Sequence, residues 1–206
     1  MYTGIVQAML PIASLVQKPG LWTFSLVLPT DLTADLITGA SVAVNGTCFT
    51  VTQIKGDEVW FDAIAETLAL TNLKHLQVGT QVNIERSARA NAEVGGHVLS
   101  GHVVDTATVL AIEDTENNRR MTFQGKPEWM KYVFSKGYLA LNGASLTIAA
   151  VQQNSFSVNL IPETLRRTNF ALLTMGDPVN VEIDQQTQVI VDTVERVMAE
   201  RTASAG

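Results

Sequence analysis

The sequence is almost devoid of cysteine, because Cys48 is the only one among 206 residues. A single cysteine excludes an intrachain disulfide, and residues 1–4 lack the positive region and apolar core of a signal peptide. No apolar run approaches the roughly 18 residues that a membrane span requires. We therefore expect a cytoplasmic protein with no membrane partner.

Positive charge is also scarce. The chain has 14 Lys and Arg against 20 Asp and Glu, which gives a formal net charge of −6 at pH 7. Lys and Arg nowhere form an extended run. A nucleic-acid partner needs clustered cationic side chains to neutralise its phosphates, so we expect no nucleic-acid partner.

Motifs for phosphate loops, dinucleotides and serine elbows are missing as well. His97 and His102 lie five residues apart, which suggests a metal site, but no third ligand cluster or cysteine pair accompanies them. The glycines around them indicate instead that the backbone closely approaches another part of the protein or a ligand. We expect no metal and no cofactor.

The clearest feature that is present is an internal repeat. Residues 43–51, Ala-Val-Asn-Gly-Thr-Cys-Phe-Thr-Val, return almost unchanged as residues 140–148, and the offset is 142 − 45 = 97 residues. The same offset pairs residues 3–6 with 100–103, 66–68 with 163–165, and 71–72 with 168–169. A period this long predicts two similar globular modules and not a solenoid of short units.

Short strands separated by turn residues dominate each half. Trp22, Phe24, Leu26 and Leu28 alternate with smaller or polar residues, which places them on one face of a strand. Asn-Gly at position 45 is suited to positive φ in a tight turn or a bulge. The pattern predicts an all-β fold in which each half is a closed or partly closed β-barrel with Greek-key connections. Short helices are expected at 30–37, capped by Thr30 or Asp31, and at 127–134.

The C-terminal segment has no counterpart in the first half. Ile190, Val194, Val197 and Met198 share one face of the helix expected there. This face could pack on the chain's own barrels or bundle with copies from other subunits. Both alternatives stay open from the sequence.

The informative positions are those where the two halves differ. Cys48 corresponds to Ser145, Ile5 to His102, Ser87 to Asp184 and Gly39 to Lys136. Such differences favour two pockets that hold the same kind of ligand in different roles. These positions also have a purely structural interpretation. A lone cysteine is often a small buried hydrophobic residue. Thr67 and Thr164 could be turn residues or could form hydrogen bonds with the edge of a flat heterocycle.

Taken together, the motifs closely resemble the riboflavin synthase family from residue 1 to about residue 200. The segments that carry the resemblance are 1–6, 45–51, 66–68, 95–97, 100–103 and 160–165. Tyr2, Phe49 and Asn142 stand where the family usually has Phe, Leu and Asp.

The resemblance implies two tandem Greek-key six-stranded β-barrels with short helices and a C-terminal α-helix. It divides the chain into an N-terminal barrel (1–97), a C-terminal barrel (98–184) and a trimerisation helix (185–203). Each barrel would bind one 6,7-dimethyl-8-ribityllumazine in a homotrimer. Transfer of a four-carbon unit between two such molecules would give riboflavin and 5-amino-6-(ribitylamino)pyrimidinedione, without a metal or redox cofactor.

The family's substrate-binding residues carry over to two pockets, between which some segments are exchanged. The first would contain Gly4, Ile5, Val6, Cys48, Phe49, Thr50, Asp62, Ala63, Ile64, Ala65, Glu66 and Thr67. The second would contain Gly101, His102, Val103, Lys136, Ser145, Leu146, Thr147, Asn159, Leu160, Ile161, Pro162, Glu163 and Thr164.

Four residues are candidates for chemistry under this resemblance. His102 and Asp184 could transfer a proton at the acidic C7 methyl group, and Cys48 or Ser145 could supply or activate a nucleophile at C7. No single base is assigned. The rival readings are an antenna protein that binds a lumazine or flavin without converting it, and a duplicated barrel with only an interaction role.

Overall fold

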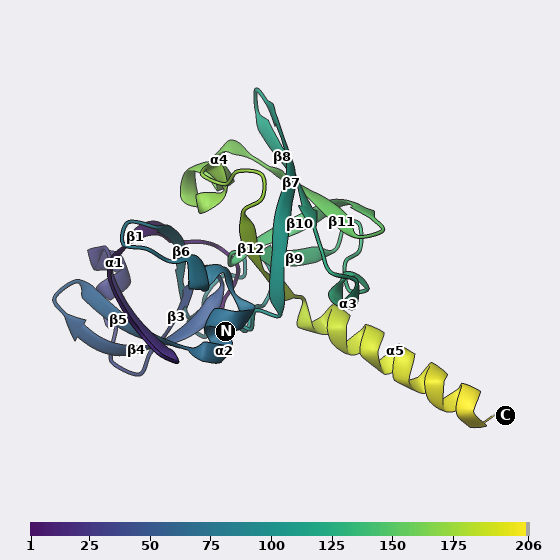
Figure 1. Ribbon diagram of the computed structural model, residues 1–206, viewed down its shortest axis with the longest axis horizontal. Helices are drawn as coiled ribbons and strands as arrows, with labels where there is room; N and C mark the ends of the chain where they lie inside the picture. Colours follow the sequence, from purple (N-terminus) through teal and green to yellow (C-terminus); the bar gives the residue numbers. More distant parts are fainter. Residues whose placement is uncertain (205–206) are drawn as a thin grey trace.

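A computed structural model describes residues 1–204 and shows two closed six-stranded antiparallel barrels followed by a helix (Figure 1). The first barrel consists of β1 (Ala8–Lys18), β2 (Leu21–Val27), β3 (Ser41–Val44), β4 (Thr47–Lys55), β5 (Glu58–Ile64) and β6 (Gln81–Arg86). The second consists of β7 (Asp105–Thr115), β8 (Asn118–Gln124), β9 (Tyr138–Leu141), β10 (Ala144–Gln152), β11 (Ser155–Leu160) and β12 (Pro178–Ile183).

Both barrels have the same circular strand order. The order in the first barrel is β1-β2-β5-β4-β3-β6. The order in the second barrel is β7-β8-β11-β10-β9-β12, which is the same cycle of equivalent strands. Strand β1 pairs with β2 and closes on β6, which are far apart in sequence. The expected pair of six-stranded barrels is confirmed.

Short helices connect the strands. They are α1 (Thr30–Thr33), α2 (Ala65–Leu70), η1 (Asn72–His75), α3 (Pro127–Met130), α4 (Pro162–Arg167) and η2 (Asn169–Ala171). The helix expected over 30–37 is wrong in its length and cap: it begins after Pro29, without a side-chain cap, and ends at Thr33. Asp35 has a φ of 58°, a left-handed conformation that a continuing helix does not allow. The helix expected over 127–134 likewise ends at Met130.

The two Asn-Gly pairs form the predicted tight turns. Asn45 and Gly46 have φ values of 46° and 77°, and Asn142 and Gly143 have φ values of 43° and 80°. Positive φ at both central residues is the signature of the two-residue turn that matches strand twist. The turns also touch: a Cβ added to Gly46 would lie 2.6 Å from the backbone N of Gly143.

Six asparagines, paired by the 97-residue offset, join the barrels around these turns: Asn45 and Asn142, Asn72 and Asn169, and Asn83 and Asn180. Their bonds occur in equivalent pairs. Asn83 Nδ2 donates to Asn142 O at 3.0 Å, and Asn180 Nδ2 donates to Asn45 O at 2.8 Å. The barrels are thus related by an approximate two-fold axis, and buried amide groups on that axis satisfy one another.

Each barrel encloses its own apolar core. The first centres on Phe24 and Phe61, whose ring centroids are 5.4 Å apart, and the second on Phe123 and Phe156 at 5.5 Å. Val6, near the start of the chain, packs in the core of the second barrel. The N-terminal segment therefore crosses from the second barrel into the first.

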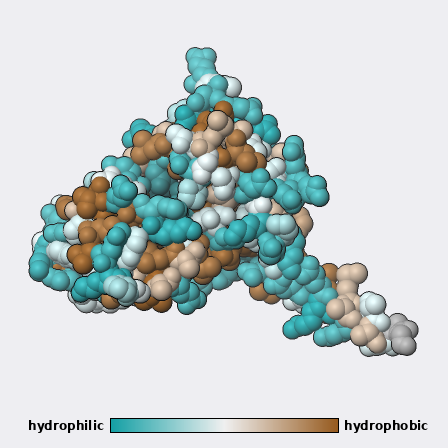
Figure 2. Space-filling view, in the orientation of Figure 1, coloured by the Kyte–Doolittle hydropathy of each residue, from teal (hydrophilic) through white to brown (hydrophobic). Residues whose placement is uncertain are grey.

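Helix α5 (Gln185–Ser204) extends away from the barrels (Figures 1 and 2). Its apolar face is exposed, with Ile190 at 64%, Val194 at 52% and Met198 at 64%. Asp192 and Glu195, on another face, bind Tyr132 and Lys131 of the second barrel. The alternative in which the apolar face packs on the chain's own barrels is therefore wrong. None of the helices within residues 1–204 is both long and apolar enough to cross a membrane.

Candidate functional site

Two chain segments each contact the barrel opposite to the one they lead into. Gly4 O accepts a hydrogen bond from Ser145 N at 2.8 Å, at the start of β10 in the second barrel. Gly101 O accepts one from Cys48 N at 3.0 Å, at the start of β4 in the first barrel. The resemblance implied that some segments are exchanged without saying which. Residues 4–6, grouped there with Cys48, lie with the second barrel, and Gly101, grouped there with Ser145, bonds to the first.

The second barrel has a cavity of about 230 Å³ at this crossing. It is lined by Gly4, Ile5, Val6, Ala144, Ser145, Leu146, Glu163, Thr164, Arg167 and Thr168. Seven of these ten residues belong to the expected substrate-binding sets. The structure therefore brings together three of the predicted segments, from the N-terminus, β10 and α4.

Arg167 is a lining residue that the sequence analysis did not identify. It follows the Glu-Thr-Leu motif by two residues, lies in α4 and pairs with Glu163. Its equivalent in the first half, 97 residues earlier, is Leu70. The same comparison of unlike positions that singled out Cys48 and Ser145 could have found this difference between the two sites.

Ser145 forms a hydrogen bond with His97, which the sequence did not identify as a site residue. Ser145 Oγ lies 2.6 Å from His97 Nδ1, and the His97 ring stacks on Tyr138 with centroids 5.3 Å apart. The backbone allows this approach because residue 96 is glycine: a Cβ there would lie 2.6 Å from Ser145 Cβ. The glycine pair before His97 was the sequence signal, since it indicated close backbone approach.

Burial sets the protonation state of His97, whose side chain is only 8% exposed. Burial lowers the pKa of His97 below its ordinary value, and the nearby Asp184 carboxylate opposes this only in part. Nε2 has no hydrogen-bond partner among residues 1–204. A neutral imidazole beside a hydroxyl can exchange a proton with it at neutral pH.

The Asp184 side chain caps the N-terminus of α5. Its Oδ2 accepts hydrogen bonds from Thr187 N at 2.9 Å and Thr187 Oγ1 at 2.6 Å, which caps the start of the helix. Burial works to raise the pKa of Asp184, but the Thr187 hydrogen bonds and nearby His97 outweigh it and the pKa lies below its ordinary value. A carboxyl group stabilised in its charged form is a weak base.

Cys48 occupies the position in the first barrel that Ser145 occupies in the second. Its thiol is half-buried and accepts a hydrogen bond from Tyr2 Oη at 3.1 Å. Burial, followed by the contact with Cys48, raises the pKa of Tyr2 above its ordinary value, so this phenol is a stable donor. A Cβ on Gly101 would lie 2.6 Å from Cys48 Cβ.

His102 and Lys136 are both exposed. Lys136 has a φ of 68°, whereas its counterpart in the first half is Gly39 with a φ of 90°. A lysine in the left-handed region costs about 1–2 kcal/mol relative to a right-handed conformation. A strained residue in place of a glycine is the kind of outlier found at functional sites.

The other residues of the two predicted sets differ in how deeply they are buried. Phe49, Ala63 and Leu160 point into the barrel cores. Thr50, Asp62, Ile64, Ala65, Glu66, Thr147, Asn159, Ile161 and Pro162 are exposed, while Thr67 and Val103 are partly buried. The two Glu-Thr-Leu motifs lie in α2 and α4, which follow the ends of β5 and β11.

Comparison with known proteins agrees with the duplicated architecture. A model of the lumazine binding domain family matches residues 3–87 and again residues 100–184. The chain is 48% identical over 202 residues to a riboflavin synthase of Escherichia coli (strain K12), covering 98% of this chain and 95% of that protein. It is 39% identical over 199 residues to a riboflavin synthase of Chlamydia pneumoniae, covering 97% and 98% of the two chains.

Among solved structures, the chain resembles LumP complexed with 6,7-dimethyl-8-(1'-D-ribityl) lumazine. The TM-score is 0.82 at 26% identity, and the match covers 90% of this chain and all of that chain. Two family-model matches, near-full-length relatives and a shared two-barrel fold point the same way. The chain belongs to the riboflavin synthase family.

Proposed function

We propose that this protein is a transferase that dismutates two molecules of 6,7-dimethyl-8-ribityllumazine. A four-carbon unit passes from one molecule to the other, which gives riboflavin and 5-amino-6-(ribitylamino)pyrimidinedione. The observation that carries the proposal is the unlike chemistry at equivalent positions of two like barrels: Cys48 beside Tyr2 in one, Ser145 beside His97 in the other. Donor and acceptor copies of one substrate require this combination of similarity and difference.

The proposed chemistry begins with loss of a proton from the C7 methyl of one lumazine and addition of a nucleophile at C7 of the other. Ser145 or Cys48 supplies or activates that nucleophile. The contact between Ser145 Oγ and His97 Nδ1 supports a role for Ser145, because neutral His97 can accept the hydroxyl proton. Holding the two rings in a reacting orientation supplies a further part of the rate.

His102 remains a proposed proton carrier, since it is exposed and follows Gly101, which bonds to Cys48 of the first barrel. Asp184 is a weaker candidate, because its lowered pKa favours the carboxylate and its oxygen caps α5. Its proposed contribution is therefore electrostatic, through His97. The exposed and partly buried residues of the two predicted sets are proposed to contact substrate from the strand and helix ends where they lie.

The working assembly is proposed to be a homotrimer in which 185–203 is the trimerisation helix, with barrels at 1–97 and 98–184. The exposed apolar face of α5 supports this. The cavity of about 230 Å³ is also small beside the 300–1,000 Å³ of typical ligand pockets, as expected of a pocket that a neighbouring subunit completes. A cytoplasmic location is proposed because one unpaired cysteine suits a reducing compartment.

The proposal is tested by incubating the purified protein with 6,7-dimethyl-8-ribityllumazine alone and following riboflavin by its absorbance. We expect turnover with two substrate molecules consumed for each riboflavin formed. The comparison variant is Ser145→Ala, which removes the hydroxyl that contacts His97. Tight binding of lumazine without riboflavin would establish a binding protein instead, and absence of binding would contradict the proposal altogether.

A further inference from the structure

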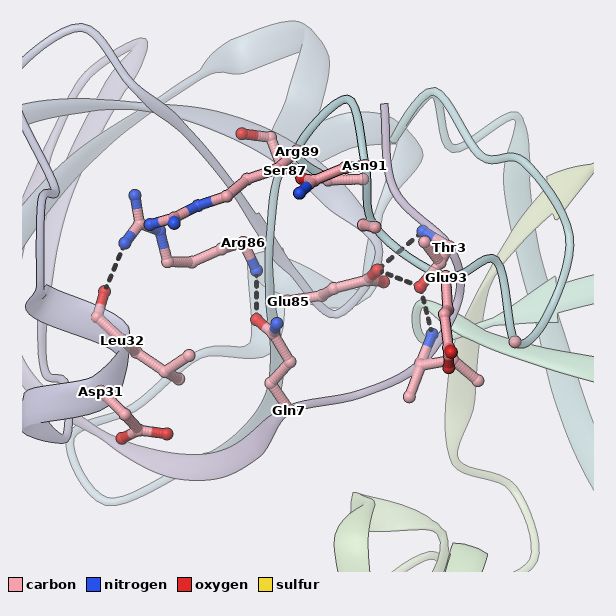
Figure 3. A pocket seen from close by; sticks show the side chains of 14 residues that line it. Thr3, Gln7, Asp31, Leu32, Glu85, Arg86, Ser87, Arg89, Asn91 and Glu93 are labelled. Carbon is pink, nitrogen blue, oxygen red and sulfur yellow. Dashed lines mark hydrogen bonds between the residues drawn. The ribbon is translucent and has the colours of Figure 1, made fainter.

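Two buried glutamates hold the segments that cross between the barrels. Glu85, on β6 of the first barrel, accepts hydrogen bonds from Thr3 N at 2.7 Å, Thr3 Oγ1 at 2.8 Å and Gly4 N at 3.0 Å. Figure 3 shows its carboxylate directed at Thr3, and both residues line a cavity of about 700 Å³. Glu85 is 5% exposed, and no Lys, Arg or His within residues 1–204 forms a salt bridge with it.

The same arrangement recurs 97 residues later. Glu182, on β12 of the second barrel, accepts bonds from Ser100 N at 2.7 Å, Ser100 Oγ at 2.8 Å and Gly101 N at 3.1 Å. It is 3% exposed. A buried carboxylate without a cationic partner carries a large desolvation cost, and hydrogen bonds to the charged form are what offset it. Its three donors all lie in the crossing segment.

Each held segment then forms a backbone hydrogen bond with the other barrel. Gly4, fixed by Glu85 of the first barrel, accepts the Ser145 amide of the second barrel. Gly101, fixed by Glu182 of the second barrel, accepts the Cys48 amide of the first. We propose that Glu85 and Glu182 are reciprocal positioning residues: each carboxylate, from its own barrel, sets the geometry of the opposite barrel's pocket.

The fit at both crossings leaves no room for displacement. A Cβ on Gly4 would lie 2.5 Å from Ser145 Cβ, and one on Gly101 would lie 2.6 Å from Cys48 Cβ. Backbone packed this closely transmits small shifts directly to the neighbouring strand. An amide could not replace either carboxylate, because its NH₂ group would face a backbone N–H and only one oxygen would accept. The structural link therefore connects the last strand of each barrel to the reactive group of the other.

The test measures hydrogen exchange at two backbone amides in the ligand-free, full-length protein. In Glu85→Gln, the exchange rate of the Ser145 amide should rise about tenfold or more, because loss of a hydrogen bond to a charged group corresponds to a factor of about ten. The exchange rate of the Cys48 amide should stay within about twofold of the wild-type rate. Glu182→Gln should show the reverse. Amides of Phe24 and Phe123, in the two cores, correct for any change in global stability.

Two milder variants cover the case in which the glutamine variants do not fold. Thr3→Val and Ser100→Ala each remove only the hydroxyl donor and should give the same crossed pattern with smaller changes. The inference is overturned if each substitution affects only the pocket of its own barrel, or if both amides respond equally to either substitution.

The link to ligand binding rests on the proposed function, and a second measurement addresses it. Titration of lumazine fluorescence should show that each glutamine variant weakens one of two binding events about tenfold and leaves the other unchanged. Equal weakening of both events would contradict a crossed positioning role. Wild-type protein that binds no lumazine would remove the proposed function, yet the exchange measurement would still decide whether the crossed positioning exists.

Discussion

Ser145 and His97, 48 residues apart, meet at 2.6 Å between Oγ and Nδ1. Ser145 is the second residue of β10, and His97 lies in the segment that links the two barrels. The histidine is buried, stacked on Tyr138 and unpartnered at Nε2 within the described chain. This contact joins the interbarrel linker to the group proposed to react, and it has measurable consequences.

Replacing His97 by Gln should lower kcat for riboflavin formation about a hundredfold, because general acid–base groups contribute about 10²–10⁴. KM should change little, since His97 does not line the cavity. The double variant with Ser145→Ala should be no slower than Ser145→Ala alone. His75→Gln, at an exposed histidine on η1, is the control and should keep wild-type kcat. Full activity in His97→Gln would contradict the assignment.

The lowered pKa of His97 predicts how stability depends on pH. In the unfolded chain the imidazole titrates at its ordinary value of about 6.5, whereas the folded protein resists its protonation because the ring is buried. The unfolded state therefore binds more protons below that pH, so the free energy of unfolding falls as pH is lowered from 6.5 towards the folded pKa. Urea denaturation of wild type and His97→Gln at pH 8 and pH 5.5 checks this. The wild type should lose more stability than the variant, and equal losses would contradict it.

The contact between the two Asn-Gly turns predicts a large cost for Gly46→Ala. The added Cβ would lie 2.6 Å from Gly143 N, and φ is already 77°. Strain in a left-handed conformation costs about 1–2 kcal/mol, and the clash with opposing backbone should add about 1–3 kcal/mol. Gly20→Ala is the matched control, because φ is also 77° there but nothing lies within 4 Å. Chemical denaturation should show clearly more destabilisation at Gly46, and equal effects would mean that the turns separate freely.

Removing one asparagine from the junction should weaken the association of the barrels. Asn180→Ala would leave Asn45 O and Asn72 N, which now bond to its side chain at 2.8 Å and 2.7 Å, without partners. Each buried unsatisfied group costs about 1–3 kcal/mol. The free energy of unfolding should therefore fall by about 2–6 kcal/mol, whereas Asn154→Ala at an exposed loop should be neutral within about 0.5 kcal/mol. A neutral Asn180→Ala would indicate that water replaces the network.

The exposed apolar face of α5 predicts sensitivity of the proposed trimer to charge. Val194→Glu should convert the assembly to smaller species, because a carboxylate would enter an apolar seam. Ala199→Glu introduces the same charge near the opposite face of the helix at 100° per residue and should leave the assembly intact. Sedimentation at several concentrations measures both. Dissociation by both variants, or by neither, would contradict a trimer formed through this face.

Local pattern predicted much of the fold. The alternation of Phe24 and Leu26 with less apolar neighbours indicated a strand because strand side chains alternate between faces. The pair Asn45 and Gly46 indicated its turn because few residues tolerate two positive φ values in succession. Helix ends were less predictable: Asp35 carries no local signal that it takes a left-handed conformation, and the expected helix was too long.

Within the candidate site, sequence identified residue types better than partners. Ser145 and Cys48 stood out because the repeat places unlike groups at equivalent positions. The exchanged segments could not be assigned, because a fixed offset carries no information about which barrel a segment contacts: residues 4–6 lie with the second barrel and Gly101 bonds to the first. His97 was left out of the site because its partner, Ser145, is distant in sequence.

The sequence by itself determined the duplication, the barrel strands, the Asn-Gly turns and the family resemblance, all of which depend on neighbouring residues or on a fixed offset. Tertiary structure decided the exchange of Gly4 and Gly101, the pairing of His97 with Ser145 and the positions of Glu85 and Glu182. These features depend on which surfaces two closed barrels present to each other after folding. Local periodicity specifies each barrel, whereas the contacts between barrels arise only from packing.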